Sequence, residues 1–138
     1  MAHFAKISED NIVLWVSTLD DKDMLDENGN SSEAVGQAYL EKHNNWPAHL
    51  WIQTSYNTKE NKHKKGGIPF RGNFAATGYI WDSVNNIFLN SKKPYSSWIL
   101  NLEKAKWESP IGDPISDPSD FGLYTWNEDN KTWDLTGK

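Results

Sequence analysis

The sequence predicts a mainly β (α+β) protein, made of antiparallel β-hairpins with aromatic cross-strand pairs and one packed helix near residues 32–43. Three observations support this fold class. The C-terminal half repeats one hairpin pattern three times, and a further hairpin pattern opens the chain. A single segment carries apolar residues at helical spacing. Eight tryptophans among 138 residues, with a mean hydropathy of −0.76, fit a polar surface around a few aromatic-rich layers.

The chain begins with a hairpin pattern whose polar turn is residues 8–11. In the expected register, Ile7 pairs with Ile12, Phe4 with Trp15, and Ala5 with Leu14. Large apolar residues occupy both alternating sets of positions in the second strand, at residues 12–15. We therefore expect this strand to be buried on both faces.

Residues 32–43 are the expected helix. Ser32 suits the N-cap position, and Glu33 follows in the first turn, where the helix dipole favours a negative charge. The apolar stripe of this helix is formed by Ala34, Val35, Ala38, Tyr39 and Leu40. Pro47 prevents any continuation, and residues 50–56 form the next expected strand.

Two loops are expected. Residues 57–68 are polar, basic and rich in glycine at their end, which is typical of a solvated loop. Residues 111–122 carry prolines, aspartates and a final glycine between the second and third repeats.

The three C-terminal repeats begin at Tyr79, Trp98 and Tyr124. Their cross-strand pairs are Trp81 with Phe88, Leu100 with Trp107, and Trp126 with Trp133. The expected turns are residues 83–86, 102–105 and 128–131, a common loop length in hairpins. Each aromatic pair stabilises a sheet by roughly 0.2–1 kcal/mol.

The length of the chain favours a single domain over residues 1–138. Within it, residues 1–77 hold the N-terminal hairpin, the helix and a strand, with the basic loop at 57–68. Residues 78–138 hold the three aromatic hairpin repeats.

Charge and composition exclude several classes of protein. A net charge of −5 gives no overall attraction to nucleic acid or to an anionic membrane, so we expect neither as a partner. The chain has no cysteine, which excludes disulfides, thiolate metal sites and a cysteine nucleophile. Residues 1–6 lack a basic region followed by an apolar run, so we expect no signal peptide.

The sequence predicts no enzyme, no cofactor and no metal site. The histidines lack metal-ligand spacing, and no serine lies in a Gly-x-Ser-x-Gly motif. Asp113, Asp117 and Asp120 could hold a cation, but aspartates and prolines in a surface loop more often form solvated turns. Paired carboxylates that meet only in three dimensions stay an open alternative.

The many aromatic residues allow two interpretations. Exposed aromatic rows can stack on sugars, whereas aromatics that face each other across hairpin strands more often form core or a protein–protein interface. The second interpretation is favoured. The candidate partner-binding residues are Tyr95 and Trp98, at the junction of two hairpins, and Lys64, Lys65 and Arg71 in the basic region.

Several segments carry a resemblance to a known family. They are Met1-Ala-His-Phe-Ala-Lys-Ile, Asp26-Glu27-Asn28-Gly29, Trp51-Ile52-Gln53-Thr54-Ser55-Tyr56-Asn57, Lys93-Pro94-Tyr95-Ser96-Ser97-Trp98 and Leu123-Tyr124-Thr125-Trp126-Asn127. Together they make the chain similar to a family of small proteins of marine bacteriophages, notably cyanophages. The resemblance spans nearly the whole chain, although residues 44–48 depart from the family pattern. It implies a virion-associated protein and no catalytic residues.

The sequence therefore predicts a minor structural protein of a bacteriophage virion, such as an accessory or capsid decoration protein. We expect it to be made in the host cytoplasm and to dock on capsid, neck or tail proteins through aromatic hairpin surfaces. The alternative is a glycan-binding module for attachment to the host surface.

Overall fold

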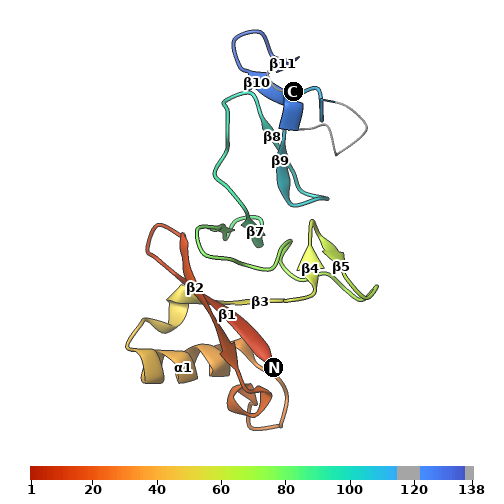
Figure 1. Cartoon of the computed structure of the whole chain (residues 1–138). Helices are drawn as coiled ribbons and strands as arrows, with labels where there is room; N and C mark the ends of the chain where they lie inside the picture. Colours follow the sequence, from red (N-terminus) through yellow and green to blue (C-terminus); the bar gives the residue numbers. More distant parts are fainter. Residues whose placement is uncertain (115–121, 136–138) are drawn as a thin grey trace.

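The computed structural model describes residues 1–114 and 122–135. It confirms the mainly β fold class, with antiparallel hairpins and one α-helix in the described ranges (Figure 1). The first strands are β1 (Ala2–Ile7), β2 (Val13–Leu19), β3 (Trp51–Thr54), β4 (Thr58–Lys59) and β5 (Lys62–His63). The later strands are β6 (Ile80–Asp82), β7 (Ile87–Leu89), β8 (Ile99–Asn101), β9 (Lys106–Glu108), β10 (Tyr124–Asn127) and β11 (Thr132–Leu135). The helices are η1 (Asp21–Met24), α1 (Glu33–Asn44) and η2 (Ala48–Leu50), of which η1 and η2 are short 3-10 helices.

Strand β1 is the centre of a three-stranded antiparallel sheet with the order β2-β1-β3. Helix α1 packs on one face of this sheet, where Phe4 lies in a cluster with Leu40. On the other face, Ala5 belongs to a cluster that contains Trp81 and Phe88 from the β6–β7 hairpin. Phe4 and Ala5 are both 0% exposed, so the central strand is buried on both faces. The hydrophobic core therefore contains residues from both parts of the chain, 1–77 and 78–138.

The predicted helix is confirmed, but its buried side is only partly as expected. Ser32 caps the N-terminus by accepting a hydrogen bond from the Val35 amide at 3.3 Å. The helix ends at Asn44, before Pro47, and the residue that caps it, Asn45, adopts a left-handed conformation with φ 52°. Its buried residues are Gly36 and Leu40, while Ala34 and Ala38 are exposed. Gly36 packs closely against the sheet, since a Cβ at this position would lie 2.6 Å from the Phe4 ring.

The turn of the N-terminal hairpin is confirmed, and its register is wrong. Ile7 pairs with Val13 in place of Ile12, and a bulge between Lys6 and Ile7 shifts the ladder by one further residue, so that Phe4 lies opposite Ser17. The expected burial of β2 on both faces is also wrong. As an edge strand, β2 leaves Trp15 63% exposed.

The three C-terminal hairpins have the predicted registers. Trp81 pairs with Phe88, Leu100 with Trp107, and Trp126 with Trp133. The three registers could be predicted because the three turns are held by the same kind of side-chain hydrogen bond. Asp82, Asn101 and Asn127 each accept hydrogen bonds from backbone amides two or three residues further along. The last residue of each turn, Asn86, Ala105 or Lys131, has a positive φ.

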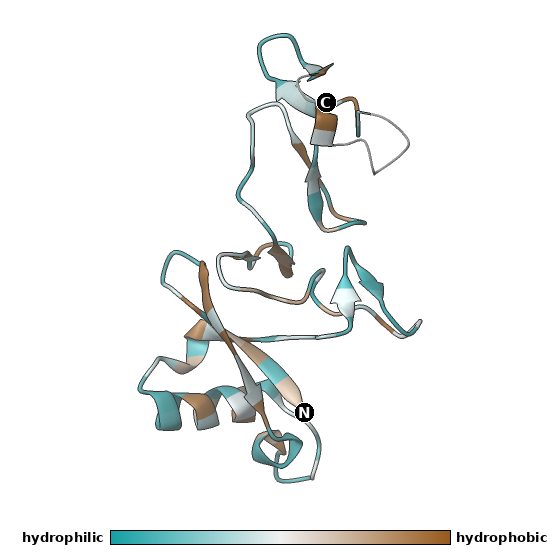
Figure 2. Ribbon diagram, viewed as in Figure 1, coloured by the Kyte–Doolittle hydropathy of each residue, from teal (hydrophilic) through white to brown (hydrophobic). Residues whose placement is uncertain are grey.

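The basic segment 57–68 is not a structureless loop, since it contains the β4–β5 hairpin. Glu60 and Asn61 at its turn both have positive φ, as a tight two-residue hairpin requires. Asn73 anchors the hairpin by accepting from the Glu60 amide at 2.8 Å and donating to the carbonyls of Phe88 and Ala105 at 2.7 and 3.0 Å. In Figure 2, this hairpin is strongly hydrophilic, whereas β7 is hydrophobic.

Candidate functional site

Tyr95 and Trp98, the predicted aromatic contacts, belong to a ring cluster in the C-terminal part. The Trp98 ring centroid lies 6.0 Å from that of Trp126 and 5.8 Å from that of Trp133, with both rings nearly edge-on. Tyr95 lies 5.6 Å from Trp98 and is 37% exposed. Trp98 itself is half-buried, so its main contacts are with other parts of the chain.

Glu128 fixes the segment before Trp98 against the β10–β11 hairpin. Its carboxylate accepts hydrogen bonds from the Ser97 hydroxyl at 2.6 Å, from the Ser97 amide at 3.1 Å and from Trp126 Nε1 at 2.8 Å. The hydrogen bonds from the side chains of Ser97 and Trp126 lower the pKa of Glu128 below its ordinary value. Glu128 therefore acts as an ionised structural acceptor in neutral solution.

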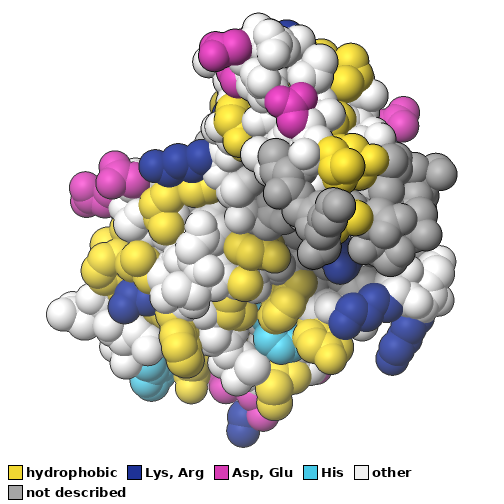
Figure 3. Space-filling view, turned by 45° about the horizontal axis from the view of Figure 1, so that its top comes forward, with side chains coloured by type: hydrophobic (Ala, Val, Ile, Leu, Met, Phe, Trp, Pro, Cys, Tyr) yellow, Lys and Arg dark blue, Asp and Glu magenta, His cyan; other side chains and the backbone are white. Residues whose placement is uncertain are grey.

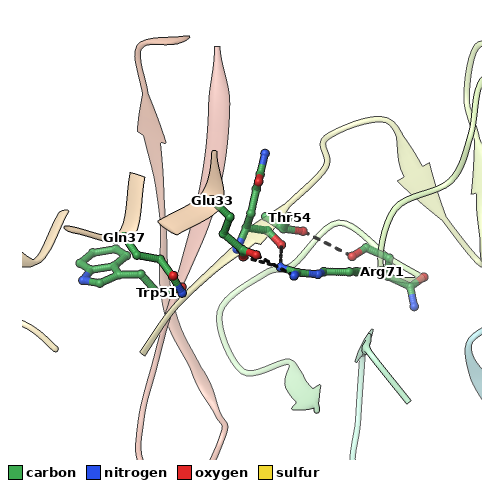
Figure 4. A network of polar contacts seen from close by, with 7 residues as sticks. Glu33, Gln37, Trp51, Thr54 and Arg71 are labelled. Atoms are coloured by element: carbon green, nitrogen blue, oxygen red, sulfur yellow. Dashed lines mark hydrogen bonds and ion pairs between the residues drawn. The ribbon is translucent and has the colours of Figure 1, made fainter. Parts of the chain in front are cut away.

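Arg71 is not a surface contact. Its guanidinium donates to both carboxylate oxygens of Glu33, at 2.5 and 2.8 Å, and to the Gln53 carbonyl at 2.9 Å (Figure 4). The side chains of Arg71 and Glu33 are 15% and 28% exposed. This ion pair joins the start of α1 to the segment that follows β5.

The same network closes the outer edge of β3. Gln37 donates to the Trp51 carbonyl at 2.6 Å, and Glu33 accepts from the Gln53 amide at 2.8 Å. The Gln53 carbonyl accepts the hydrogen bond from Arg71 that is described above. Unpaired groups on a sheet edge are a template for pairing with another chain, so these side chains protect that edge.

The direction of the backbone groups in β2 follows from these contacts. Gln53 points its amide and carbonyl away from β1, so its partner Phe4 must direct its own backbone groups to β2. Phe4 pairs there with Ser17. Since backbone groups alternate along a strand, those of Val16 and Thr18 point out of the sheet.

The outer edge of β2 is therefore open at Val16 and Thr18. Within residues 1–114 and 122–135, β2 pairs with β1 as its single strand neighbour, and no hydrogen bond reaches these outward groups. Nearer the turn the edge is covered, because Val13 exchanges backbone hydrogen bonds of 2.8 Å with Gly78 and Tyr79. The opening thus spans the part of β2 that lies beyond the bulge.

Two large apolar side chains adjoin this open edge. Trp15 is 63% exposed and Leu14 is 40% exposed. This feature could not be predicted from the sequence, because the expected register places Trp15 opposite Phe4 in a strand buried on both faces. A local pattern does not reveal whether a strand lies at the edge of its sheet.

A second feature is a hollow of about 330 Å³ beside the β4–β5 hairpin. Its residues include the aromatic side chains of Tyr56, Phe74 and Tyr79 and the lysines Lys59, Lys64 and Lys106. Figure 3 shows Lys and Arg side chains gathered, beside hydrophobic ones, on the side of the molecule where β4 and β5 lie in Figure 1. Of the three predicted basic contacts, Lys64 lines this hollow and Lys65 is exposed nearby, whereas Arg71 is bound to Glu33.

The groups around the hollow contact one another closely. Lys64 Nζ lies 4.1 Å from the Tyr56 ring centroid, and Phe74 packs edge-on against the same ring at 5.6 Å. His3 lies 5.3 Å from Phe74, and burial together with the N-terminal charge lowers the pKa of His3. Lys106 Nζ is 3.6 Å from Glu60 Oε1.

The described residues include neither a metal-binding cluster nor a membrane-spanning helix. Among them no group of three or more His, Asp or Glu side chains could hold a metal ion. Of the candidate aspartates, Asp113 is described, whereas Asp117 and Asp120 lie outside the described residues. No helix in the described part of the chain is long and apolar enough to cross a membrane.

Comparisons with known proteins give no relative. No protein-family model matches the chain, and no curated protein or solved structure matches it. The open edge of β2 and the lysine-lined hollow are therefore the features from which a function can be inferred.

Proposed function

We propose that this protein is a minor structural component of a bacteriophage virion, which docks on a capsid, neck or tail protein through the open edge of β2. The observation that supports docking is the pair of unpaired outward backbone positions, Val16 and Thr18, beside the exposed Trp15. The phage setting comes from the resemblance to small cyanophage proteins.

An extended segment of the partner would add a strand to β2. Backbone hydrogen bonds supply affinity in such a complex, and side-chain contacts supply specificity. Tryptophan is among the residues in which interface energy concentrates, so Trp15 would be the main anchor. It takes this role in place of Tyr95 and Trp98, because the Trp98 ring already packs against two other tryptophans.

Two measurements test the proposal. Mass spectrometry of purified virions should detect the protein in the particle. Particles made without the protein should then bind it again when it is added, as measured by co-sedimentation. In this second assay, Trp15→Ser should reduce binding on the order of tenfold or more, as expected for an interface anchor.

Thr18→Pro tests the backbone contribution. The Thr18 amide points away from β1, so proline there removes an outward donor and leaves the ladder to β1 intact. The matched control is Ile99→Ser on β8, because Ile99 is 62% exposed and so is comparable with Trp15. Each variant must keep the circular dichroism spectrum of the original protein.

Two outcomes would contradict the proposal. The first is absence of the protein from purified particles. The second is that folded Trp15→Ser and Thr18→Pro variants bind as well as the original protein, while Ile99→Ser or Tyr95→Ala loses binding.

A further inference from the structure

The hollow beside the β4–β5 hairpin combines positive charge with an aromatic wall, and β2 docking uses neither. We propose that this hollow binds an acidic saccharide, a short sugar chain carrying carboxylates. The lysines would bind the carboxylate, and the aromatic wall would contact the C–H face of the sugar.

Two of the three lysines of the hollow, Lys59 and Lys64, form no ion pair among the described residues, whereas Lys106 pairs with Glu60, which also lines the hollow. Lys59 lies directly opposite Lys62 across the hairpin, and like charges in this position destabilise a sheet. Among the described residues neither of them forms an ion pair, and Glu60 reaches Lys106 instead. The chain as a whole carries a net charge of −5, so this local excess of lysine is a distinct feature. A carboxylate bound in the hollow would give Lys59 an anionic partner.

The aromatic wall excludes simpler ligands. A lone inorganic anion would use the lysines and leave Tyr56, Phe74 and Tyr79 without a role. A neutral sugar would contact the rings and leave the lysines uncompensated.

The hollow is fixed in shape before any ligand arrives. Thr58 at its base is 1% exposed, and its hydroxyl accepts from the Phe70 amide at 3.0 Å. Asn73 joins the β4–β5 turn to β7 and to the β8–β9 turn through three hydrogen bonds. A rigid site avoids much of the entropic cost of ordering side chains on binding. Its volume of about 330 Å³ is at the lower end of the range for small-ligand sites, which suits a short saccharide.

The test is a titration of the complete protein by isothermal calorimetry and NMR. The probe is digalacturonic acid, and the comparison ligands are lactose, inorganic phosphate and AMP. We expect digalacturonic acid to bind more tightly than the other three, to shift NMR signals of Lys64 and Lys106, and to weaken as salt is added.

Matched variants identify the site. Lys64→Gln and Lys106→Gln should each weaken digalacturonic acid binding on the order of tenfold, and Lys64→Arg should retain most of it. Lys104→Gln is the control, because Lys104 lies on the same hairpin as Lys106 but pairs with Glu108 at 3.9 Å outside the hollow. Trp15→Ser should leave saccharide binding unchanged.

Three results would overturn the inference. The first is that digalacturonic acid does not bind. The second is that the Lys64→Gln and Lys106→Gln variants bind it as tightly as the original protein does. The third is that phosphate or AMP binds the original protein at least as tightly as digalacturonic acid. None of these results bears on docking through β2, which is tested separately with particles.

Discussion

Replacing Arg71 with methionine should destabilise the protein by about 2–3 kcal/mol. The change removes the two hydrogen bonds from Arg71 to Glu33 and the one to the Gln53 carbonyl. Methionine keeps an unbranched stem at a position where φ is 54°, so the backbone penalty is nearly the same for both residues. The measured loss therefore reports on the guanidinium.

The magnitude follows from the exposure of the pair. Breaking a fully buried ion pair costs about 3–5 kcal/mol, whereas an exposed pair contributes about 0–1 kcal/mol. With Arg71 15% and Glu33 28% exposed, the pair lies between these limits but closer to the buried one. A matched exposed pair is Lys104 with Glu108, where the Lys104 side chain is 56% exposed, and Lys104→Met should cost less than about 0.5 kcal/mol.

Urea unfolding followed by tryptophan fluorescence measures both losses. A double-mutant cycle that adds Glu33→Gln should give a coupling energy of about 1–2 kcal/mol between the two side chains. A loss below about 1 kcal/mol for Arg71→Met, or no coupling to Glu33, would refute the view that this network holds α1 to the edge of β3.

Three further predictions concern the remaining structure. Gly72→Ala should cost about 2–3 kcal/mol in urea unfolding, because φ is 79° and the new Cβ would lie 2.8 Å from the Cβ of Ala105; a neutral result would contradict this. Trp98→Ala should cost about 2–4 kcal/mol, since its ring packs against two other tryptophans, and an unchanged thermal midpoint would show that the cluster is not structural. The lowered pKa of Glu128 contributes stability that is present above the ordinary glutamate pKa and is lost as pH falls through the lowered value. Glu128→Gln should therefore flatten the fall in stability as pH drops below the ordinary glutamate pKa, and an unchanged pH profile would contradict this.

The hairpins could be predicted from the sequence because their determinants are local. Each C-terminal turn is preceded by Asp82, Asn101 or Asn127, whose side chains hold the turn, and each has large residues at matched distances on both sides. The helix was found for the same reason, through its cap at Ser32. These signals lie within a few residues of the structure that they specify.

The register of the first hairpin could not be read in this way. Val13 bonds to Gly78 and Tyr79, more than sixty residues further along the chain, and the ladder to β1 carries a bulge beside it. The exposure of Trp15 depends on that register and on the edge position of β2. Both are set by contacts that the local pattern does not contain.

The candidate site could likewise be predicted only in part, because several of its contacts are between residues far apart in the sequence. Lys64 was found because it lies in a basic run, but its contact with Tyr56 and the approach of Lys106 from another hairpin depend on the fold. The basic region likewise makes Arg71 a candidate partner contact, but in the structure its guanidinium is bound within the protein. Its partner Glu33 lies 38 residues earlier in the chain.

Amide hydrogen exchange at the edge of β2 tests the central claim most directly. In the free protein, the amides of Val16 and Thr18 should exchange at close to the rate of an unprotected chain, while that of Ser17, which faces β1, should be protected. When the protein is attached to particles, Val16 and Thr18 should become protected by on the order of tenfold or more, because a partner strand then bonds to them. Protection of Val16 and Thr18 already in the free protein, or unchanged exchange after attachment, would contradict docking through this edge.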